Sequence, residues 1–140
     1  MTIPRILLTG ATGHVGGAAL RLLLRQPAGP TLAVAARDRL RLGLLATGAV
    51  DVVPFDFTQP AAIAPALNGV TGQLLVRPPA FSDVRCYLLP VVRAAVAAGV
   101  EHVALLALHG AQHNPFVPHP WSGLLARLGA ALFAASACRS

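Results

Sequence analysis

Three glycines, each separated from the next by two residues, stand where one apolar run gives way to another. Gly10, Gly13 and Gly16 follow the run "ILLT" at 6–9 and begin a segment rich in leucine that ends near Arg25. If the first run is a strand and the second a helix, the turn between them presents unpaired backbone N–H groups and the positive end of the helix dipole. Such a turn attracts phosphate groups.

In this interpretation the three glycines have separate roles. Gly10 allows the tight turn, Gly13 lets the backbone approach a pyrophosphate, and Gly16 lets the helix and the strand touch. The spacing G-x-x-G-x-x-G differs from the common G-x-G-x-x-G fingerprint, and a glycine turn that only joins strand to helix is the structural alternative. The succession of strand, turn, helix and second strand favours a dinucleotide site.

Charged residues end the next apolar run, about 20 residues further along the chain. An acid at this place binds the ribose hydroxyls of NAD, whereas an arginine accepts the 2′-phosphate of NADP. The chain has Arg37 and then Asp38, with Arg39 close behind. These residues favour NADP, leave NAD open, and have a solvated charged loop as their alternative.

Two further pairs follow the third and fourth apolar runs. Asp56 and Phe57 could flank an adenine, although a helix cap for Asp56 and a core position for Phe57 are the alternatives. Arg77 and Pro78 close the fourth run, beside the point where ligands sit in open α/β sheets.

The elements that must position these residues alternate between strands and helices. Buried strands are predicted at 3–9, 31–37, 50–57, 72–79 and 101–108, and helices at 14–25, 38–48, 58–69 and 83–98. Strands joined by such helices need crossover connections, so the sheet is parallel. We predict a three-layer Rossmann fold of the α/β class, a doubly wound sheet with strand order 3-2-1-4-5.

The apolar pattern also predicts which helix residues face the core and where helices begin and end. In helix 14–25, one side is formed by Val15, Ala18, Ala19, Leu22 and Leu23. Thr58 is the predicted N-cap of helix 58–69, and the segment 83–98 is predicted to be one long helix closed by Gly99.

Composition limits the other functions. With 140 residues we expect one domain, and without 18 uninterrupted apolar residues or a signal peptide we expect a cytoplasmic protein that does not enter a membrane. The net charge of +6 comes from scattered arginines without interleaved aromatic residues, which makes nucleic acid an improbable partner. Cys86 and Cys138 are predicted to be reduced thiols packed as small apolar groups.

Metal and hydrolase chemistry are not favoured by the spacing of the candidate residues. His109, His113 and His119 stand in a segment broken by Pro115 and Pro118, with no acid or cysteine nearby, so no metal site is predicted. No serine stands in a nucleophile-elbow pattern.

The stretches "LLTGATGHVGG", "AARD", "DFT", "LLVRPPAFSDVR" and "LPVVRAAVAAGVEHVALLALHGAQHNPFVPH" together resemble the NmrA-like branch of the atypical short-chain dehydrogenase/reductase superfamily. The likeness runs from about Ile3 to His119. It implies an NAD(P)-binding Rossmann domain over residues 1–119, with 120–140 as an atypical tail of the same domain, for which a helix is one option.

The resemblance also implies a set of cofactor contacts. The loop residues Gly10, Thr12, Gly13, His14 and Val15 would meet pyrophosphate and ribose. Arg37 would face the adenosine end, Asp56 and Phe57 the adenine, and Arg77 with Pro78 the ribose on the nicotinamide side.

The departures from the family pattern concern the chemistry. Short-chain reductases share a Tyr-x-x-x-Lys pair, in which the lysine helps the phenol to donate a proton; this chain has Tyr87 and no lysine, so no catalytic residue is assigned. The text after His119 departs from the family, and we expect a truncated or frame-shifted reading of a longer gene.

Two functions follow as hypotheses. The first is an NAD(P)H-dependent reductase of quinones or other small carbonyl compounds by ancestry, with weak or no activity of its own. The second is a non-catalytic NAD(P) sensor that acts through a protein partner. A sheet that ends after the fifth strand would leave an edge uncovered, so a partner chain or self-association is also expected.

Overall fold

A five-stranded parallel sheet runs through the centre of the computed structural model, which describes residues 3–37, 48–78, 80 and 83–106. The strands lie in the order β3-β2-β1-β4-β5, which confirms the predicted order. Their bounds are β1 (Arg5–Leu8), β2 (Thr31–Ala36), β3 (Val50–Pro54), β4 (Gly72–Leu75) and β5 (His102–Leu105).

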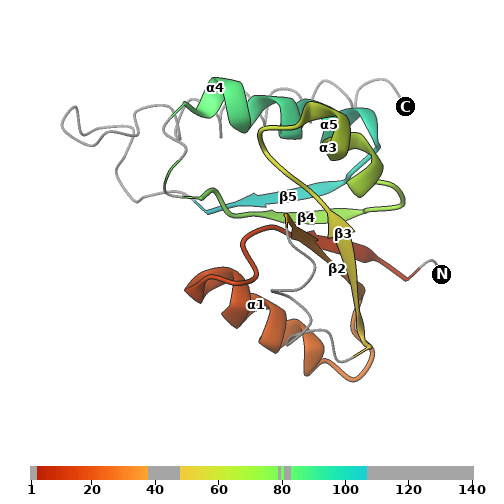
Figure 1. Cartoon of the computed structure of the whole chain (residues 1–140). Helices are drawn as coiled ribbons and strands as arrows, with labels where there is room; N and C mark the ends of the chain where they lie inside the picture. The colour runs from red at the N-terminus through yellow and green to blue at the C-terminus, as the bar shows by residue number, and fades with distance from the viewer. Residues whose placement is uncertain (1–2, 38–47, 79, 81–82, 107–140) are drawn as a thin grey trace, which may run out of the picture.

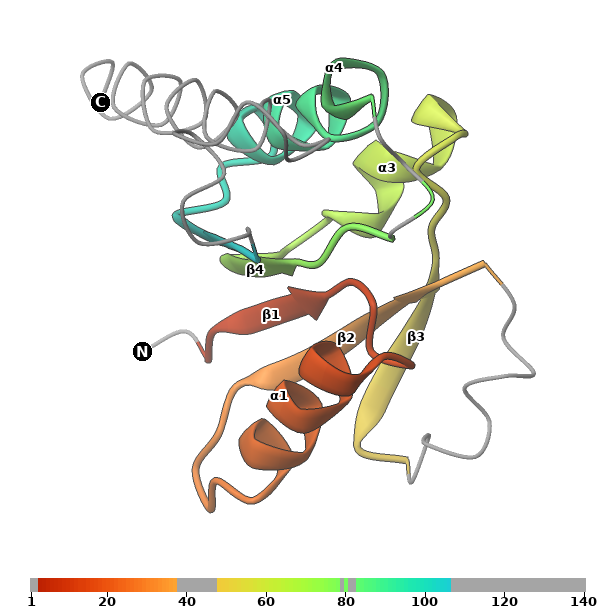
Figure 2. The same ribbon diagram turned by 90° about the vertical axis from the view of Figure 1, so that its left-hand side faces the viewer.

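Helices lie on both faces of the sheet and complete the three layers. Helix α1 (His14–Leu24) covers one face, and α3 (Pro60–Ala66), α4 (Val84–Tyr87) and α5 (Leu89–Ala97) lie on the other (Figures 1 and 2). The predicted tail 120–140 and all but the last residue of predicted helix 38–48 lie outside the described residues. The predicted Rossmann fold is confirmed, whereas its division into 1–119 and 120–140 stays a prediction.

Neighbouring residues of β1 serve two separate cores. Leu7 is fully buried in the cluster beneath α3 and α5, and Leu8 is fully buried in the cluster that contains Leu20 of α1. Successive side chains of a strand point to opposite faces, and both faces are covered here, so the continuous apolar run "ILL" suits this central strand.

The buried side of α1 matches the predicted one only in part: Ala19 and Leu23 pack partly buried against the core, as predicted, whereas other predicted residues are exposed. Its buried residues are Gly16, Gly17 and Leu20, while Val15 is 48% exposed and Leu22 is 61% exposed. The glycines have no Cβ, so this side of the helix can approach the turn before it more closely than a side built from leucines. A pattern that counts large apolar residues misses such a contact.

The prediction that Thr58 is the N-cap of α3 is wrong. The cap residue is Gln59, and the Thr58 hydroxyl instead donates a hydrogen bond to Oδ1 of Asp56 at 2.7 Å. The helix begins at Pro60 and ends at Ala66, directly after Pro65. It is therefore shorter than the predicted helix 58–69.

The single helix predicted over 83–98 is two helices, α4 and α5, separated at Leu88. Pro90 stands in the first turn of α5. Proline has no N–H to bond to the preceding turn, and its ring clashes with the carbonyl four residues earlier, so it suits the start of a helix and interrupts a continuous one.

Candidate functional site

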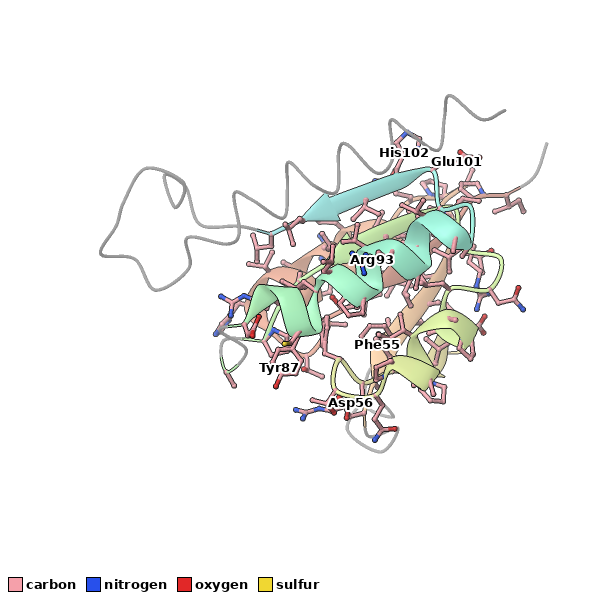
Figure 3. The ribbon with its side chains drawn as sticks, turned by 90° about the horizontal axis from the view of Figure 1, so that it is seen from above. Phe55, Asp56, Tyr87, Arg93, Glu101 and His102 are labelled. Atoms are coloured by element: carbon pink, nitrogen blue, oxygen red, sulfur yellow. The ribbon has the colours of Figure 1, made fainter. Side chains whose placement is uncertain are left out.

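The residues predicted to bind the cofactor meet at one edge of the sheet. Gly10 follows β1, Arg37 follows β2, Asp56 follows β3 and Arg77 follows β4. Because all five strands are parallel, their carboxyl ends share this edge. In Figure 3, Asp56 and Tyr87 lie near it, away from Glu101 and His102 at the amino end of β5.

The turn after β1 is shaped by two glycines that no other residue could replace without strain. Gly10 has a φ of +70°, and a Cβ there would lie 3.0 Å from the Val76 side chain. A Cβ at Gly16 would lie 2.2 Å from the carbonyl oxygen of Gly10. Gly10 therefore allows the turn against β4, and Gly16 allows the helix to close onto it.

Gly13 has a different environment, because it is exposed and a Cβ there would lie 3.3 Å from the Gly10 oxygen. Its N–H bonds to that same oxygen at 2.9 Å, and it is the N-cap of α1 with no side chain to cap the helix. A side chain at Gly13 would project into the space in front of the turn.

Three exposed residues of this turn have backbone N–H groups without an acceptor in the described part of the chain. They are Thr12, His14 and Val15. Unpaired N–H groups at the start of a helix, together with the positive end of its dipole, form an anion-binding arrangement. The glycine cradle and these free donors fit the diphosphate of a dinucleotide.

Thr9 is a structural residue of the site that the sequence analysis did not identify. Its side chain is buried, with 1% of the residue exposed, and its hydroxyl accepts a hydrogen bond from the N–H of Val76 at 2.7 Å and donates one to the carbonyl of Val76 at 3.0 Å. These bonds join the end of β1 to the chain just after β4. A hydroxyl that ends a buried strand needs a partner, and this was the available signal.

Arg77 and Pro78 follow Val76, whose backbone is held in place by the Thr9 hydroxyl. Both are half-buried, and Nη1 of Arg77 donates a hydrogen bond to the carbonyl of Pro78 at 3.3 Å. Val76, just before them, abuts Gly10. This arrangement places the Arg77–Pro78 segment beside the glycine turn.

Asp56 and Arg37 form the other part of the edge. Burial tends to raise the pKa of the Asp56 carboxyl, but hydrogen bonds from the N–H and hydroxyl of Thr58 and the charge of Arg37 outweigh it, so this pKa lies below its ordinary value. Arg37 itself is exposed. Asp56 thus closes its own turn and attracts the arginine predicted to hold the 2′-phosphate.

Phe57 lies in the core beneath α3 and α5, with 8% of the residue exposed. Its ring meets that of Phe55 edge to face, with centroids 5.0 Å apart and an interplanar angle of 86°. The contact of Phe57 with an adenine stays a prediction.

The remaining reactive groups do not form a second site among the described residues. Cys86 is a free but exposed thiol, so the prediction that it packs as a small apolar group is wrong; a hydrogen bond with Asp83 and the charge of that carboxylate raise the pKa of the Cys86 thiol. Cys138 and the three loop histidines lie outside the described residues. The described part contains no group of His, Cys, Asp and Glu suited to a metal, and none of its helices is long and apolar enough to span a membrane.

Comparison with known proteins agrees with this geometry. A solved triphenylmethane reductase of Citrobacter sp., complexed with NADP(H), matches with a TM-score of 0.77 and 27% identity, covering 90% of this chain and 46% of that protein. An NADPH-dependent quinone oxidoreductase of Escherichia coli, complexed with NADPH, matches with a TM-score of 0.78 and 26% identity, covering 89% of this chain and 45% of that one.

A curated relative shows the same relationship by sequence. Quinone oxidoreductase 2 of Escherichia coli is 29% identical over 110 residues, which are 79% of this chain and 38% of the relative. The chain therefore spans less than half the length of the proteins it matches here. The model of the NAD(P)H-binding family matches residues 10–137, and the chain belongs to this family, as its resemblance to the NmrA-like short-chain reductases predicted.

Proposed function

We propose that the chain binds NADP(H) at the carboxyl edge of its sheet, with the diphosphate at the turn between β1 and α1. The observation that carries this proposal is a set of N–H groups, those of Thr12, His14 and Val15, that have no acceptor among the described residues and lie in front of a turn that only glycines can form. Membership of the NAD(P)H-binding family and the NADP(H)-bound neighbours support the same ligand.

The other predicted site residues take the two ends of the dinucleotide in this proposal. Arg37 accepts the 2′-phosphate, and Asp56 with Phe57 flanks the adenine. Arg77 and Pro78 contact the ribose on the nicotinamide side, which agrees with their place next to the glycine turn. An arginine at the end of β2 favours NADP over NAD.

The reaction that we propose by ancestry is the reduction of quinones or other small carbonyl compounds, for which bound NADPH supplies a hydride. Relatives that carry such names support this class of substrate. The chain lacks the Tyr-x-x-x-Lys pair, so we expect little or no turnover by this chain alone.

A non-catalytic NAD(P) sensor that acts through a protein partner is the second candidate, favoured by the same missing pair. We further propose that the protein works in the cytoplasm. A partner chain or a second copy covers the β5 edge in this proposal, because β5 pairs only with β4 among the described strands.

The test of the binding site is a titration of the purified chain with NADPH and NADH, repeated for Gly13→Val. The valine side chain enters the space in front of the turn, so we expect the Kd for NADPH to rise at least about tenfold. Gly72→Ala is the matched control. Gly72 lies at the amino end of β4, away from the glycine turn, and a Cβ there makes ordinary contacts, the nearest at 3.5 Å. Equal affinity of Gly13→Val and the unaltered chain would refute the site.

Arg37→Ala tests the preference for NADP. We expect it to weaken NADPH binding by about tenfold, the loss of one charge-assisted contact, and to leave NADH binding unchanged. An equal effect on both dinucleotides would contradict the assignment of the 2′-phosphate to Arg37.

Turnover separates the two candidate functions. A reductase oxidises NADPH when a quinone is added, which is followed by the loss of absorbance of the reduced nicotinamide. A sensor binds NADPH with the same affinity and consumes none.

A further inference from the structure

His14 is an exposed titratable residue at the mouth of the glycine turn. It is the first residue of α1, and its imidazole has no hydrogen-bond or ion-pair partner among the described residues. The first turn of the helix contains no acidic residue, and the N-cap Gly13 has no side chain.

Other charged groups border this edge on the neighbouring elements. Arg37 and Arg77 lie just after β2 and β4. From β3 comes Asp56, whose pKa is lowered by the Thr58 hydrogen bonds and Arg37 against the effect of burial, so it stays ionised. Before α4 lies Asp83, whose Oδ1 accepts the N–H of Cys86. On α1 itself the next charged residue is Arg21, which extends back toward Gly17.

Histidine is the side chain that ordinarily changes its charge between about pH 5 and 8. A diphosphate in front of the turn carries two negative charges, and these attract an imidazolium at the first residue of α1.

We infer that His14 couples dinucleotide binding to protonation, so that the chain binds its diphosphate more tightly as the pH falls. This inference rests on the proposed function, since it needs a diphosphate at the glycine turn. The sign follows from the charge: the additional affinity is fully present at the acid end of this pH range and is lost toward its alkaline end.

The test measures the Kd of NADH at acid, neutral and mildly alkaline pH and constant ionic strength. NADH is the probe because it lacks the 2′-phosphate, which titrates in the same range. We expect the Kd of the unaltered chain to rise about three- to tenfold from the acid to the alkaline end, as for one exposed charge pair. His14→Gln should bind NADH weakly and His14→Lys should bind it tightly. Neither variant should show this pH dependence.

His102→Gln is the matched control, because His102 is an exposed histidine at the start of β5, on the opposite edge of the sheet. It should keep the pH dependence of the unaltered chain. Calorimetry in buffers of different ionisation enthalpy gives a second readout: binding should take up a fraction of a proton in the unaltered chain and none in His14→Gln.

The outcomes separate this inference from the proposed function. If NADH and NADPH bind to no variant at any pH, the proposed site fails and the inference with it. If both bind, but His14→Gln keeps the pH dependence and the proton uptake of the unaltered chain, the site stands and the inference is overturned.

Discussion

At the scale of single residues, two glycines of the turn after β1 have different roles: Gly16 serves folding, and Gly13 is proposed to serve binding. Gly16 faces the backbone of Gly10, whereas Gly13 faces the open side of the turn. Substitution of the first therefore changes folding, and substitution of the second changes binding. The folding role of Gly16 can therefore be tested without any ligand.

We expect Gly16→Ala to lower the free energy of unfolding by about 3 kcal/mol or more, because its methyl group would lie 2.2 Å from a backbone oxygen that no side-chain rotation can move. Urea unfolding measures the change. Gly13→Ala is the control: its methyl group would lie 3.3 Å from the same oxygen, a tight contact that a much smaller shift relieves, so it should lose far less stability than Gly16→Ala. Equal unfolding midpoints for the two variants would contradict this account of α1.

Asp56 gives a prediction for the dependence of stability on pH. The pKa of its carboxyl in the folded chain is lower than in the unfolded chain, so ionised Asp56 stabilises the fold above about pH 4. This stabilisation is lost as the pH falls through the folded-state pKa.

Thr58→Val removes the hydroxyl that donates to Asp56 at 2.7 Å. We expect the pKa of Asp56 to rise in this variant, as followed by NMR titration of the carboxyl. The difference in stability from the unaltered chain should be present at pH 7 and vanish in strong acid. Thr58→Ser keeps the hydroxyl and should keep the low pKa; a pKa that is the same in Thr58→Val would refute the role of the hydroxyl.

At the scale of the elements, the bond between Thr9 and Val76 fixes how the first and fourth strands end together. The Thr9 hydroxyl accepts a hydrogen bond from the N–H of Val76 and donates one to its carbonyl. Thr9→Val keeps the shape of the side chain but leaves the N–H of half-buried Val76 without this partner, at a cost of about 1–3 kcal/mol. We expect this loss in urea unfolding, and with it weaker NADPH binding, because the Arg77–Pro78 segment loses its anchor.

Thr9→Ser is the matched variant for this prediction, because it retains the hydroxyl and removes only a methyl group. It should keep NADPH affinity. If Thr9→Val and Thr9→Ser bind NADPH equally, the hydroxyl does not position the segment.

The strand order and the place of the glycine turn were predictable. They follow from the spacing of the apolar residues along the sequence and from the right-handed connection between parallel strands. Apolar runs separated by helical stretches leave few topologies, and the observed order is among them. The break at Leu88 was also within reach, since Pro90 was present in the sequence. The buried side of α1 was not, because contact through Gly16 and Gly17 carries no apolar signal.

The place of a candidate residue in the fold was predictable where it stands at the end of a strand, as Arg37 does directly after β2 and Arg77 does two residues after β4, whereas their contacts with a cofactor stay predictions. The site was not predictable where a side chain bonds to a residue distant in sequence, as Thr9 does to Val76 across 67 positions. Phe57 shows a third case: its type allowed either a ligand contact or a core position, and its packing against Phe55 shows the core position, whereas the ligand contact stays a prediction.

At the scale of the whole molecule, the two faces of the sheet are covered unequally within the described residues. The exposed large apolar side chains lie on the stretch before β1, on α1 and just after β5, whereas α3 and α5 expose none. They are Ile3, Val15, Leu22, Leu24 and Leu106. Three of the five lie on α1, and exposed apolar groups of this kind favour association.

The two outer strands of the sheet, β3 and β5, also differ in how readily another chain could pair with them. β3 contains Asp51, which pairs with Arg5 at 2.7 Å, and ends with Pro54. A charge and a proline on an edge strand discourage pairing with another chain. β5 has the sequence His-Val-Ala-Leu, with neither an acidic residue nor a proline. Of the two described edges, β5 is therefore the one open to pairing.

We expect the purified chain to associate through β5 in a concentration-dependent way, and Ala104→Lys to shift it toward the monomer, because a lysine on an edge strand must lose its hydration when another strand pairs there. Ala104 is exposed, so the substitution leaves the two cores intact. Sedimentation velocity over a wide range of protein concentration measures the change. Ala98→Lys, at the exposed end of α5, adds the same charge away from the edge and should leave association unaltered. A chain that stays monomeric throughout this range, or an equal effect of both lysines, would show that β5 is not the contact.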